Sequence, residues 1–389
     1  MPSSESRNAS PGGAAAAATE GAAGTVRVVP AGPGDRARYD AAVQACGKPH
    51  FMQLWGWGEV KRATGWEPFR YLAVDEGGRT RGAMTVLARP LPGLGTVLYA
   101  PTGPAVAYAD REAARALLAA AGELARRRRA LMLRIDPDVP VDRRDVVDLL
   151  QELGFRRGTA ATAFEALQPR FVMRLELAPT PEETLARFEP KTRYNIRYAA
   201  RHGVTARAAA GEDDLRAFYE LLRLTAARQR FAIRAFSYYQ ALWRHLIEPG
   251  FGRLFLAEHA GRPVAGVMVF RCGDTVWYLY GGTDYEARKV MPSHAAQWAA
   301  IQWAIAEGCR IYDFRGVSGN LDPSDPHYGL YRFKKGFGAE LVEYIGEFER
   351  VYRPVRYGAF RAAFAARRQL LRLLRRAASA STQGEGAER

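Results

Sequence analysis

The pattern of apolar and polar residues predicts the same series of elements twice along this chain. Two stretches, 70–86 and 254–270, each read as a strand, a glycine-containing turn and a second strand. Each stretch is followed by a third strand, an alanine-rich helix and a fourth strand that ends in aspartate: 96–99, 111–128 and 131–136 in the first copy, and 275–280, 293–307 and 310–313 in the second.

A single sequence offset relates the two copies on both sides of their turns. It aligns Leu72 with Leu256 and Met84 with Met268. The repeated order β-β-β-α-β is the core of an N-acetyltransferase-like (GNAT) α/β domain, in which helices cover a mixed sheet. We therefore predict an α/β protein with two tandem GNAT-like domains.

The predicted domains leave a low-complexity tail at each end of the chain. The tails are residues 1–24 and 377–389; the first domain takes 25–172 together with 346–376, and the second takes 173–345. Helices between Pro181 and Ile247 open the second domain, and this stretch lacks the heptad run of a coiled-coil arm. A C-terminal helix from about Arg356 is expected to pack back on the first domain.

The composition excludes several classes of protein. The 389 residues are 48% hydrophobic, but no run approaches the roughly 18 to 20 apolar residues of a membrane span, so we expect a cytoplasmic protein. Three cysteines and six histidines are scattered, which favours no disulfide, metal or cofactor. The net charge is +15, but nine arginines and no acidic residue lie between Arg350 and Arg376. The positive charge that would indicate a polyanionic partner is therefore concentrated mostly in this segment.

The turn before each predicted alanine-rich helix does not suit acyl-CoA. Acyl-CoA enzymes of this fold use a glycine-rich turn whose N–H groups bind the pyrophosphate at a helix N-terminus. In the second copy this turn, residues 283–294, has Met291-Pro292 where glycines are needed, and residues 101–110 of the first copy do not match either. We therefore expect a different acyl donor.

Four motifs in a fixed order resemble those of the FemABX aminoacyltransferases. They are FMQLWGWGEVK at 51–61, KTRYNIR at 191–197 followed by Gly203-Val204, YLYGGT at 278–283, and YGLYRFKKGFG at 328–338. The last motif is similar to the GLYxFKxGFG signature of that family. The resemblance extends from about Thr25 to Arg353, which is nearly the whole ordered body of the chain.

The resemblance implies a fold of two GNAT-like domains; some members also carry a coiled-coil arm, but the missing heptad run makes this chain similar to the armless kind. It also implies an aminoacyltransferase that uses aminoacyl-tRNA as donor. The acceptor would be the side-chain amine of the third residue of the peptidoglycan stem peptide, in UDP-MurNAc-pentapeptide or lipid II, and the product an interpeptide bridge or branch. The first domain would bind the acceptor and the second the donor, and we expect a monomer.

Acyl transfer from an ester to an amine needs a neutral amine, a stabilised oxyanion and a departing ribose oxygen. The resemblance assigns catalysis to Phe333 and Lys334, whose ammonium would stabilise the oxyanion or contact a tRNA phosphate; the alternative is a solvated charge on an exposed turn. Lys335 is a candidate for tRNA contact with the same alternative. Family position makes Asp136 a candidate base or acceptor contact, and the alternative is an Asx turn before Pro137.

The resemblance also points to an acceptor-binding pair of cations. Lys61 and Arg234 fall where related enzymes hold the diphosphate of a UDP-linked acceptor, a task that suits cations. Arg234 is one of three arginines between 228 and 234, so the position of the second cation stays open. Tyr238 follows one helical turn later and is expected to share the site, with Tyr239 as the competing register.

Two tyrosines of the third motif are further acceptor candidates. Tyr278 and Tyr280 are two residues apart, so a regular strand places them on the same side. Related enzymes have tyrosines here in the acceptor cleft. The spacing alone is equally compatible with an aromatic pair in the core.

Two basic segments are candidates for polyanion contact. A basic stripe on one helix, suited to the phosphates of tRNA or simply solvated, would be formed by Lys191, Arg193, Arg197 and Arg201. The C-terminal segment places Phe360, Phe364, Leu371 and Leu374 among its arginines. Such a basic amphipathic helix suits either peripheral contact with an anionic membrane or packing on the first domain with its arginines toward tRNA.

The motifs are compatible with three functions. The first is a tRNA-dependent aminoacyltransferase of peptidoglycan synthesis. The second is a FemABX-like enzyme that acts on another small amine or peptide, with an acyl-CoA N-acyltransferase as a more distant variant. The third is a non-catalytic tRNA- or membrane-associated protein, which the intact Phe333-Lys334 pair disfavours.

Overall fold

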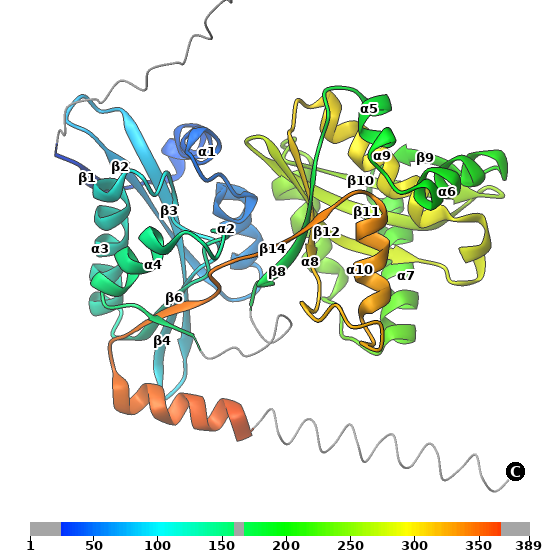
Figure 1. Ribbon diagram of the computed structural model, residues 1–389. Helices are drawn as coiled ribbons and strands as arrows, with labels where there is room; N and C mark the ends of the chain where they lie inside the picture. The colour runs from blue at the N-terminus through cyan, green and yellow to red at the C-terminus, as the bar shows by residue number, and fades with distance from the viewer. Residues whose placement is uncertain (1–24, 159–166, 367–389) are drawn as a thin grey trace, which may run out of the picture.

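The computed structural model describes residues 25–158 and 167–366, which form two α/β domains (Figure 1). The first domain contains β1 (Arg27–Pro30), β2 (Glu67–Val74), β3 (Thr80–Leu91), β4 (Gly95–Ala100), β5 (Ala105–Val106), β6 (Ala130–Ile135), β7 (Arg156–Arg157) and β15 (Phe348–Val351). Its helices are η1 (Pro33–Asp35), α1 (Arg36–Ala45), η2 (Phe51–Gln53), α2 (Trp55–Arg62), α3 (Arg111–Arg127) and α4 (Arg144–Glu152).

The second domain repeats this plan with more helices. Its strands are β8 (Phe171–Glu176), β9 (Thr205–Ala208), β10 (Gly252–His259), β11 (Arg262–Cys272), β12 (Thr275–Thr283), β13 (Ile311–Gly316) and β14 (Glu340–Glu343). Its helices are α5 (Pro181–Ala186), α6 (Pro190–Arg201), α7 (Glu212–Gln229), α8 (Phe236–Leu242), the π-helical turn η3 (Trp243–Ile247), η4 (Glu286–Val290), α9 (Pro292–Ala306) and α10 (Tyr328–Gly336).

The two sheets confirm the predicted duplication. The first has the order β1-β2-β3-β4-β6-β15-β7 with β5 paired to β3, and the second has the order β14-β8-β13-β12-β11-β10-β9. In each, three antiparallel strands lead through a helix to a fourth strand that pairs parallel with the third. The helix is α3 in the first domain and α9 in the second, so both sheets are mixed as expected for GNAT-like domains.

The chain passes from one sheet to the other twice. It enters the second sheet through β8, leaves through the adjacent β14, and returns to the first sheet as β15, which pairs with β6. Residues just before β8 and just after β13 therefore lie close to both domains. This crossing places two distant parts of the sequence beside the candidate catalytic residues described below.

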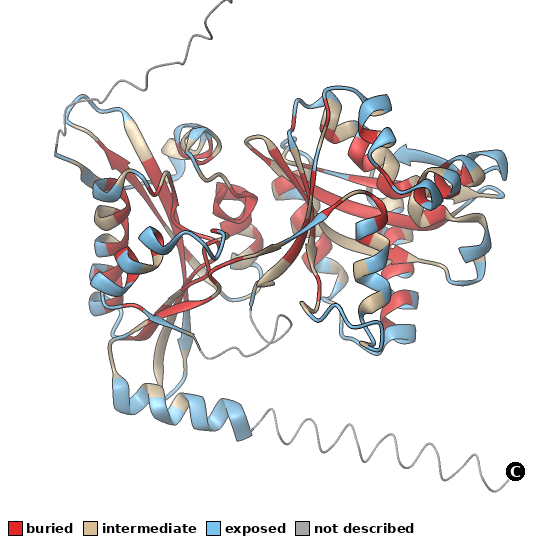
Figure 2. Ribbon diagram, in the orientation of Figure 1, coloured by how far each residue is buried: buried red, intermediate tan, exposed pale blue. Residues whose placement is uncertain are grey.

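Helices cover both faces of each sheet, and the apolar side chains form three clusters. Helices α3 and α4 pack on the outer face of the first sheet, and α5, α6, α9 and α10 lie on the outer side of the second. Helices α1 and α2 of the first domain and α7 and α8 of the second share one inner apolar cluster, which spans both domains. Figure 2 shows that buried residues continue from the strands into these inner helices.

Aromatic packing and a close helix approach join the domains. The ring of Phe51, fully buried, stacks on Phe270 of β11 at a centroid distance of 5.1 Å and contacts Trp277 of β12 at 5.5 Å. Gly56 in α2 lies against η3, where an added Cβ would come within 2.1 Å of the carbonyl oxygen of His245. A side chain at position 56 would push the domains apart, which explains why this motif contains glycine.

The second domain carries no coiled-coil arm, as predicted. All residues from 173 to 345 are described, and the longest helix between Thr180 and Ile247 is α7, with 18 residues packed on the second sheet. Within residues 25–158 and 167–366, no helix combines the length and apolarity required to cross a bilayer.

The prediction that the C-terminal helix packs on the first domain is wrong for its described part, residues 354–366. This helix is exposed along most of its length, with Val355 86% and Phe364 59% exposed (Figure 2). Near its start, the hydroxyl of Tyr357 donates a hydrogen bond to the carboxylate of Glu349 in β15. Arginines and small residues interrupt its apolar positions, so it has no continuous apolar stripe to bury. The predicted continuation to residue 376, with Leu371 and Leu374, lies outside the described residues.

Candidate functional site

The family signature forms helix α10, and its packing buries Lys334. Phe337 is fully buried against Phe188 and Phe314, at ring distances of 5.2 and 5.3 Å. Gly336 allows α10 to approach α6, because an added Cβ would lie 2.5 Å from the hydroxyl of Thr192. The GFG ending of the motif therefore lets α10 pack closely against the second domain.

Lys334 is a buried lysine that faces the end of β13 and is only 3% exposed. Its Nζ donates hydrogen bonds to the carbonyl oxygens of Arg315, at 3.2 Å, and Gly316, at 2.7 Å. Burial lowers its pKa to about 7, an effect that the nearby Asp313 carboxylate opposes. The alternative of a solvated charge on an exposed turn is therefore excluded, and an ammonium group has one N–H more than the two that bind these carbonyl groups.

Asp136 follows β6 and is a buried carboxyl group rather than an Asx turn. One oxygen accepts a hydrogen bond from the hydroxyl of Tyr99, and the other accepts one from the backbone N–H of Thr102, both at 2.7 Å. The pKa of Asp136 is raised to about 7, mainly by burial. The two hydrogen bonds and the charge of Arg134 oppose this rise, and the charge of Glu347 adds to it. A carboxyl group with a pKa near 7 is suited to accept a proton at neutral pH.

The predicted acceptor residues Lys61, Arg234, Tyr238 and Tyr280 come together between the domains. The Nζ of Lys61 lies 4.4 Å from the ring centroid of Trp57 and 3.5 Å from the hydroxyl of Tyr238. The guanidinium of Arg234 lies 5.7 Å from the ring centroid of Tyr238, whose hydroxyl is 3.4 Å from that of Tyr280. These contacts favour Arg234 as the second cation and Tyr238 as the register of the site.

This cluster carries positive charge without a neutralising carboxylate. Within residues 25–158 and 167–366, neither Lys61 nor Arg234 forms an ion pair. Burial and, to a smaller extent, the positive charge of Arg234 together lower the pKa of Lys61 to about 8. Two adjacent cations in an aromatic setting form a site that an anionic group would stabilise. Tyr239, the competing register, packs against Tyr219 and Tyr280 instead.

The prediction that Tyr278 and Tyr280 face the same side of the sheet is wrong. A β-bulge interrupts the pairing of β11 with β12, so that Met268 pairs with Tyr280 and Val269 with Tyr278, leaving Leu279 unpaired. The extra residue reverses the alternation. Tyr278 consequently packs on the outer side of the second sheet with α9, whereas Tyr280 joins the inner cluster beside Tyr238.

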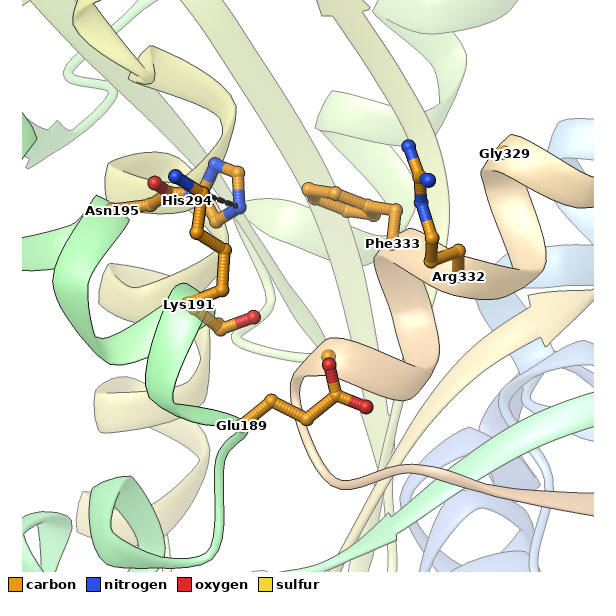
Figure 3. A pocket seen from close by; sticks show the side chains of 9 residues that line it. Glu189, Lys191, Asn195, His294, Gly329, Arg332 and Phe333 are labelled. Carbon is orange, nitrogen blue, oxygen red and sulfur yellow. Dashed lines mark hydrogen bonds between the residues drawn. The ribbon is translucent and has the colours of Figure 1, made fainter.

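A cavity of about 540 Å³ opens in the second domain between α6, the start of α9 and α10 (Figure 3). Its lining includes two predicted residues, Lys191 and the half-buried Phe333. The amide nitrogen of Asn195 lies 3.1 Å from Nε2 of His294, while the buried Oδ1 of Asn195 has no hydrogen-bond partner among the described residues. Burial, with a smaller effect of Lys191, lowers the pKa of His294 to about 4, so the ring is neutral at pH 7. The remaining lining residues are Glu189, Thr192, Gly329, Arg332 and Gly336.

Of the other candidates for tRNA contact, one is hydrogen-bonded within the protein and the rest are exposed to solvent. Lys191 and Arg197 are exposed on α6, and Lys335 is exposed on α10 with its Nζ 5.8 Å from the ring of Tyr331. Arg193 instead turns back to the end of α5, where it donates hydrogen bonds to the carbonyl oxygens of residues 186 and 188. Arg193 therefore stabilises the connection between α5 and α6 and is not a free member of the stripe.

The structure of the turn before α9 agrees with a donor other than acyl-CoA. The 3₁₀-helix η4 fills this turn, and Met291 adopts a left-handed conformation with φ of 55°. Pro292 occupies the first position of α9 and removes one of the N–H groups that a pyrophosphate would bind.

Comparison of the sequence with known proteins identifies the family of this chain. A profile of the FemAB family matches residues 35–246 and 253–364, nearly the whole described chain. The chain belongs to the FemAB family. A lipid II:glycine glycyltransferase of Staphylococcus aureus (strain USA300) is 29% identical to it, over 80% of this chain and 90% of the relative. The prediction of an aminoacyltransferase is thereby confirmed.

Structural comparison confirms the fold. The crystal structure of FemX superposes with a TM-score of 0.77 at 27% identity, covering 83% of this chain and 98% of FemX. A tandem GNAT protein from the clavulanic acid biosynthesis pathway superposes with a TM-score of 0.50 at 15% identity, over 83% of this chain and 98% of that protein, and shows the shared fold alone.

Sequence reasoning missed several residues around the candidate site. Tyr99 and Thr102 bind Asp136, Arg315 faces Lys334 through its carbonyl group, and Asn195 and His294 line the cavity. None stands at a spacing that signals a role, since each reaches the site through tertiary contacts. The one available hint was Asn195, an amide within the KTRYNIR motif.

Proposed function

We propose that this FemAB enzyme transfers an amino acid from aminoacyl-tRNA to the side-chain amine of the third residue of the peptidoglycan stem peptide. The acceptor is lipid II or UDP-MurNAc-pentapeptide, and the product is the interpeptide bridge or its first branch. The relative named lipid II:glycine glycyltransferase supports this acceptor class. The observation that carries the proposal is the pair Lys61 and Arg234 beside Tyr238, for which the described part of the chain supplies no ion pair.

Both acceptors contain a diphosphate, which is the group that this pair of cations suits. Lys61 supplies a compact charge that is already partly desolvated, and Arg234 supplies a planar fork for two phosphate oxygens. Tyr238 and Tyr280 add hydroxyl groups on the same side. Binding of the anion would offset the mutual repulsion of the two cations. This favours an acceptor that carries a diphosphate over a small amine without an anionic group.

The second domain supplies the donor side. Lys191 and Arg332 lie at the cavity beside α10, where positive charge suits the phosphates near the 3′ end of the tRNA (Figure 3). Phe333 faces this cavity, while Lys334 points from the same helix toward the end of β13. We assign donor binding to this part of the molecule, with Lys191, Arg197 and Lys335 as phosphate contacts.

The reaction joins the acceptor nitrogen to the carbonyl carbon of the ester and breaks the bond to the ribose oxygen. Lys334 stabilises the negative charge on the carbonyl oxygen in the tetrahedral intermediate. Asp136 accepts the proton that the amine loses, and the same proton is then passed on to the ribose oxygen as it departs, which regenerates the carboxylate. The ester is already activated, so no nucleophilic side chain is needed.

The C-terminal helix provides a route to the membrane that holds a lipid-linked acceptor. Val355 and Phe364 are exposed among arginines, and Phe360 and Phe364 pack at a ring distance of 6.0 Å. We propose that this helix binds peripherally to anionic lipid. The full chain should float with vesicles that contain phosphatidylglycerol but not with phosphatidylcholine vesicles, and a chain ending at Arg353 should lose this binding. Equal flotation of the two chains would rule out the helix as the anchor.

The test of the proposed function is a transfer assay with radiolabelled aminoacyl-tRNAs. The protein is incubated with UDP-MurNAc-pentapeptide in one tube and lipid II in another, with RNase-treated tRNA as control. Label on one acceptor that is abolished by RNase and by Lys334→Met establishes donor and acceptor together. No label on either, with folded protein and verified substrates, would remove the proposal and direct the search to other amines.

The donor side has its own matched comparison. Lys191→Met should raise the KM for aminoacyl-tRNA several-fold and leave the KM for the acceptor unchanged, because it removes a phosphate contact at the cavity. Arg79→Met removes one positive charge from an exposed turn of the first domain and serves as the control. An equal effect of both variants would show that only net charge matters.

A further inference from the structure

A chain of hydrogen bonds connects Asp136 in the first domain with the surroundings of Lys334 in the second. The side chain of Arg315 donates a hydrogen bond to Oε1 of Gln168. The amide nitrogen of Gln168 donates to the hydroxyl of Tyr99 at 3.1 Å, and that hydroxyl donates to Asp136 at 2.7 Å. Arg315 also accepts, through its carbonyl oxygen, a hydrogen bond from Lys334. The two candidate catalytic groups are therefore joined through Arg315, Gln168 and Tyr99.

The direction of this chain is set by its first member. A guanidinium group can only donate, so the oxygen of the Gln168 amide must face Arg315 and its nitrogen must face Tyr99. The hydroxyl of Tyr99 accepts from Gln168 and directs its own hydrogen to Asp136. The orientation of the Gln168 amide therefore makes the Tyr99 hydroxyl a donor to one carboxylate oxygen of Asp136.

The backbone at Arg315 has the shape that this double contact requires. Arg315 adopts a left-handed conformation with φ of 61°, and its N–H donates to the carboxylate of Asp313 at 2.6 Å. Gly316 follows, and an added Cβ there would lie 2.7 Å from the side chain of Pro169. The segment that contains Gln168 therefore lies directly against the end of β13, where both carbonyl groups that bind Lys334 are located.

We infer that Gln168 and Arg315 are positioning residues that hold Asp136 and Lys334 in register across the two domains. They do not touch the reacting atoms. Gln168 stands in the crossing between the sheets, just before β8, so it can transmit a displacement of one domain to the catalytic group of the other. This inference rests on the proposed function, in which the first domain accepts the proton and the second stabilises the oxyanion.

Other polar groups also face the two ends of the chain and are expected to remain in place when Gln168 alone is changed. Those around Asp136 are Tyr99 of β4, the N–H of Thr102, Arg134 of β6 and Glu347 before β15. Those around Lys334 are Asp313 and Arg315 of β13, and Asp313 in turn accepts from the hydroxyl of Tyr344 at 3.3 Å. A change at Gln168 therefore alters the link between the ends and leaves the direct partners of each end intact.

The test measures transfer rates for Gln168→Ala, Tyr99→Phe and the double variant. Gln151→Ala, an exposed glutamine on α4, is the matched control. Gln168→Ala should lower kcat about 10- to 100-fold and change both KM values by less than about threefold, because geometry and not substrate binding is disturbed. The double variant should be no slower than the slower single variant, since both break the same chain.

A pH profile separates positioning from a general loss of packing. Gln168→Glu keeps the acceptor toward Arg315 but replaces the donor toward Tyr99 with a negative charge, which favours protonated Asp136. The acidic limb of its kcat profile should therefore move to higher pH, whereas that of Gln168→Ala should move less. An unmoved limb in Gln168→Glu, additive effects in the double variant, or a kcat of Gln168→Ala equal to that of Gln151→Ala would each overturn the inference.

Thermal unfolding provides a readout that does not depend on activity. The loss of melting temperature caused by Gln168→Ala should shrink in a Tyr99→Phe background if the two side chains act through one chain. A wild-type enzyme without transferase activity would remove the proposed function, and this cycle would still decide whether the chain couples the domains. Independent effects of the two substitutions would overturn the coupling itself.

Discussion

The charge state of Lys334 provides the most direct test of the proposed chemistry. Burial lowers its pKa to about 7, from an ordinary value of 10.5. The ammonium is the form that stabilises an oxyanion, so raising the pH should remove the contribution of Lys334 while the protein stays folded. Lys334→Met is the matched perturbation, because methionine has a similar shape without a charge.

The expected magnitude follows from the pKa. Removing one preorganised oxyanion donor costs about 100- to 1,000-fold in kcat, and this should be the ratio of wild-type to Lys334→Met rates below about pH 6. Above pH 7 the fraction of Lys334 that is protonated falls about tenfold with each pH unit. At pH 9 about 1% remains, and the ratio should fall to about 2 to 10.

The assay compares initial transfer rates of the two enzymes from pH 6 to pH 9. Taking the ratio at each pH cancels the ionisation of the acceptor amine and the spontaneous hydrolysis of the ester, which affect both enzymes equally. A ratio that stays large and constant across this range would refute the assignment of the shifted pKa to Lys334. A ratio near one throughout would refute its role as oxyanion stabiliser.

Stability measurements guard against a trivial loss of structure in this variant. The pKa of Lys334 is lower in the folded than in the unfolded chain, so protonation favours the unfolded state. The stability linked to the neutral amine is fully present above about pH 10.5 and is lost as the pH falls toward 7. Methionine removes this penalty, and Lys334→Met should therefore melt no lower than the wild type at pH 7.

Three further outcomes test other parts of the structure. Lys61→Met should raise the KM for the diphosphate-containing acceptor about 10-fold or more with a smaller change in kcat, whereas Lys289→Met, at an exposed lysine, should leave both unchanged; equal effects would refute the anion site. Asp136→Asn should lower kcat and abolish the acidic limb of its pH profile, which lies near pH 7 in the wild type because burial raises the pKa of this carboxyl group. Phe51→Ala should lower the free energy of unfolding by about 3 to 5 kcal/mol in chemical denaturation, because it opens a cavity beside Phe270 in the core shared by the domains; a loss below about 1 kcal/mol would contradict a fused core.

The duplicated fold could be predicted from the sequence because local residue patterns encode its elements. Hairpins around glycine turns, and the alanine-rich helices that became α3 and α9, follow periodicities that do not depend on the rest of the chain. The same reasoning failed at Tyr278 and Tyr280, because a bulge depends on how β11 and β12 pair. It also failed for residues 354–366, where an amphipathic pattern predicts a helix but not the surface on which it packs.

The candidate site divides in the same way. The sequence by itself determined that this chain carries the FemAB motifs, with Lys61, Arg234 and Lys334 as basic residues within or near them, since motif chemistry is a local property. Only the tertiary structure decided that Lys334 is buried, that Lys61 and Arg234 share Tyr238, and that Arg193 is occupied by α5. Burial, pKa and hydrogen bonding depend on neighbours that are distant in sequence, such as Gln168 and Tyr99 beside Asp136. These contacts arise when the chain crosses between its two sheets, and no spacing along the sequence specifies them.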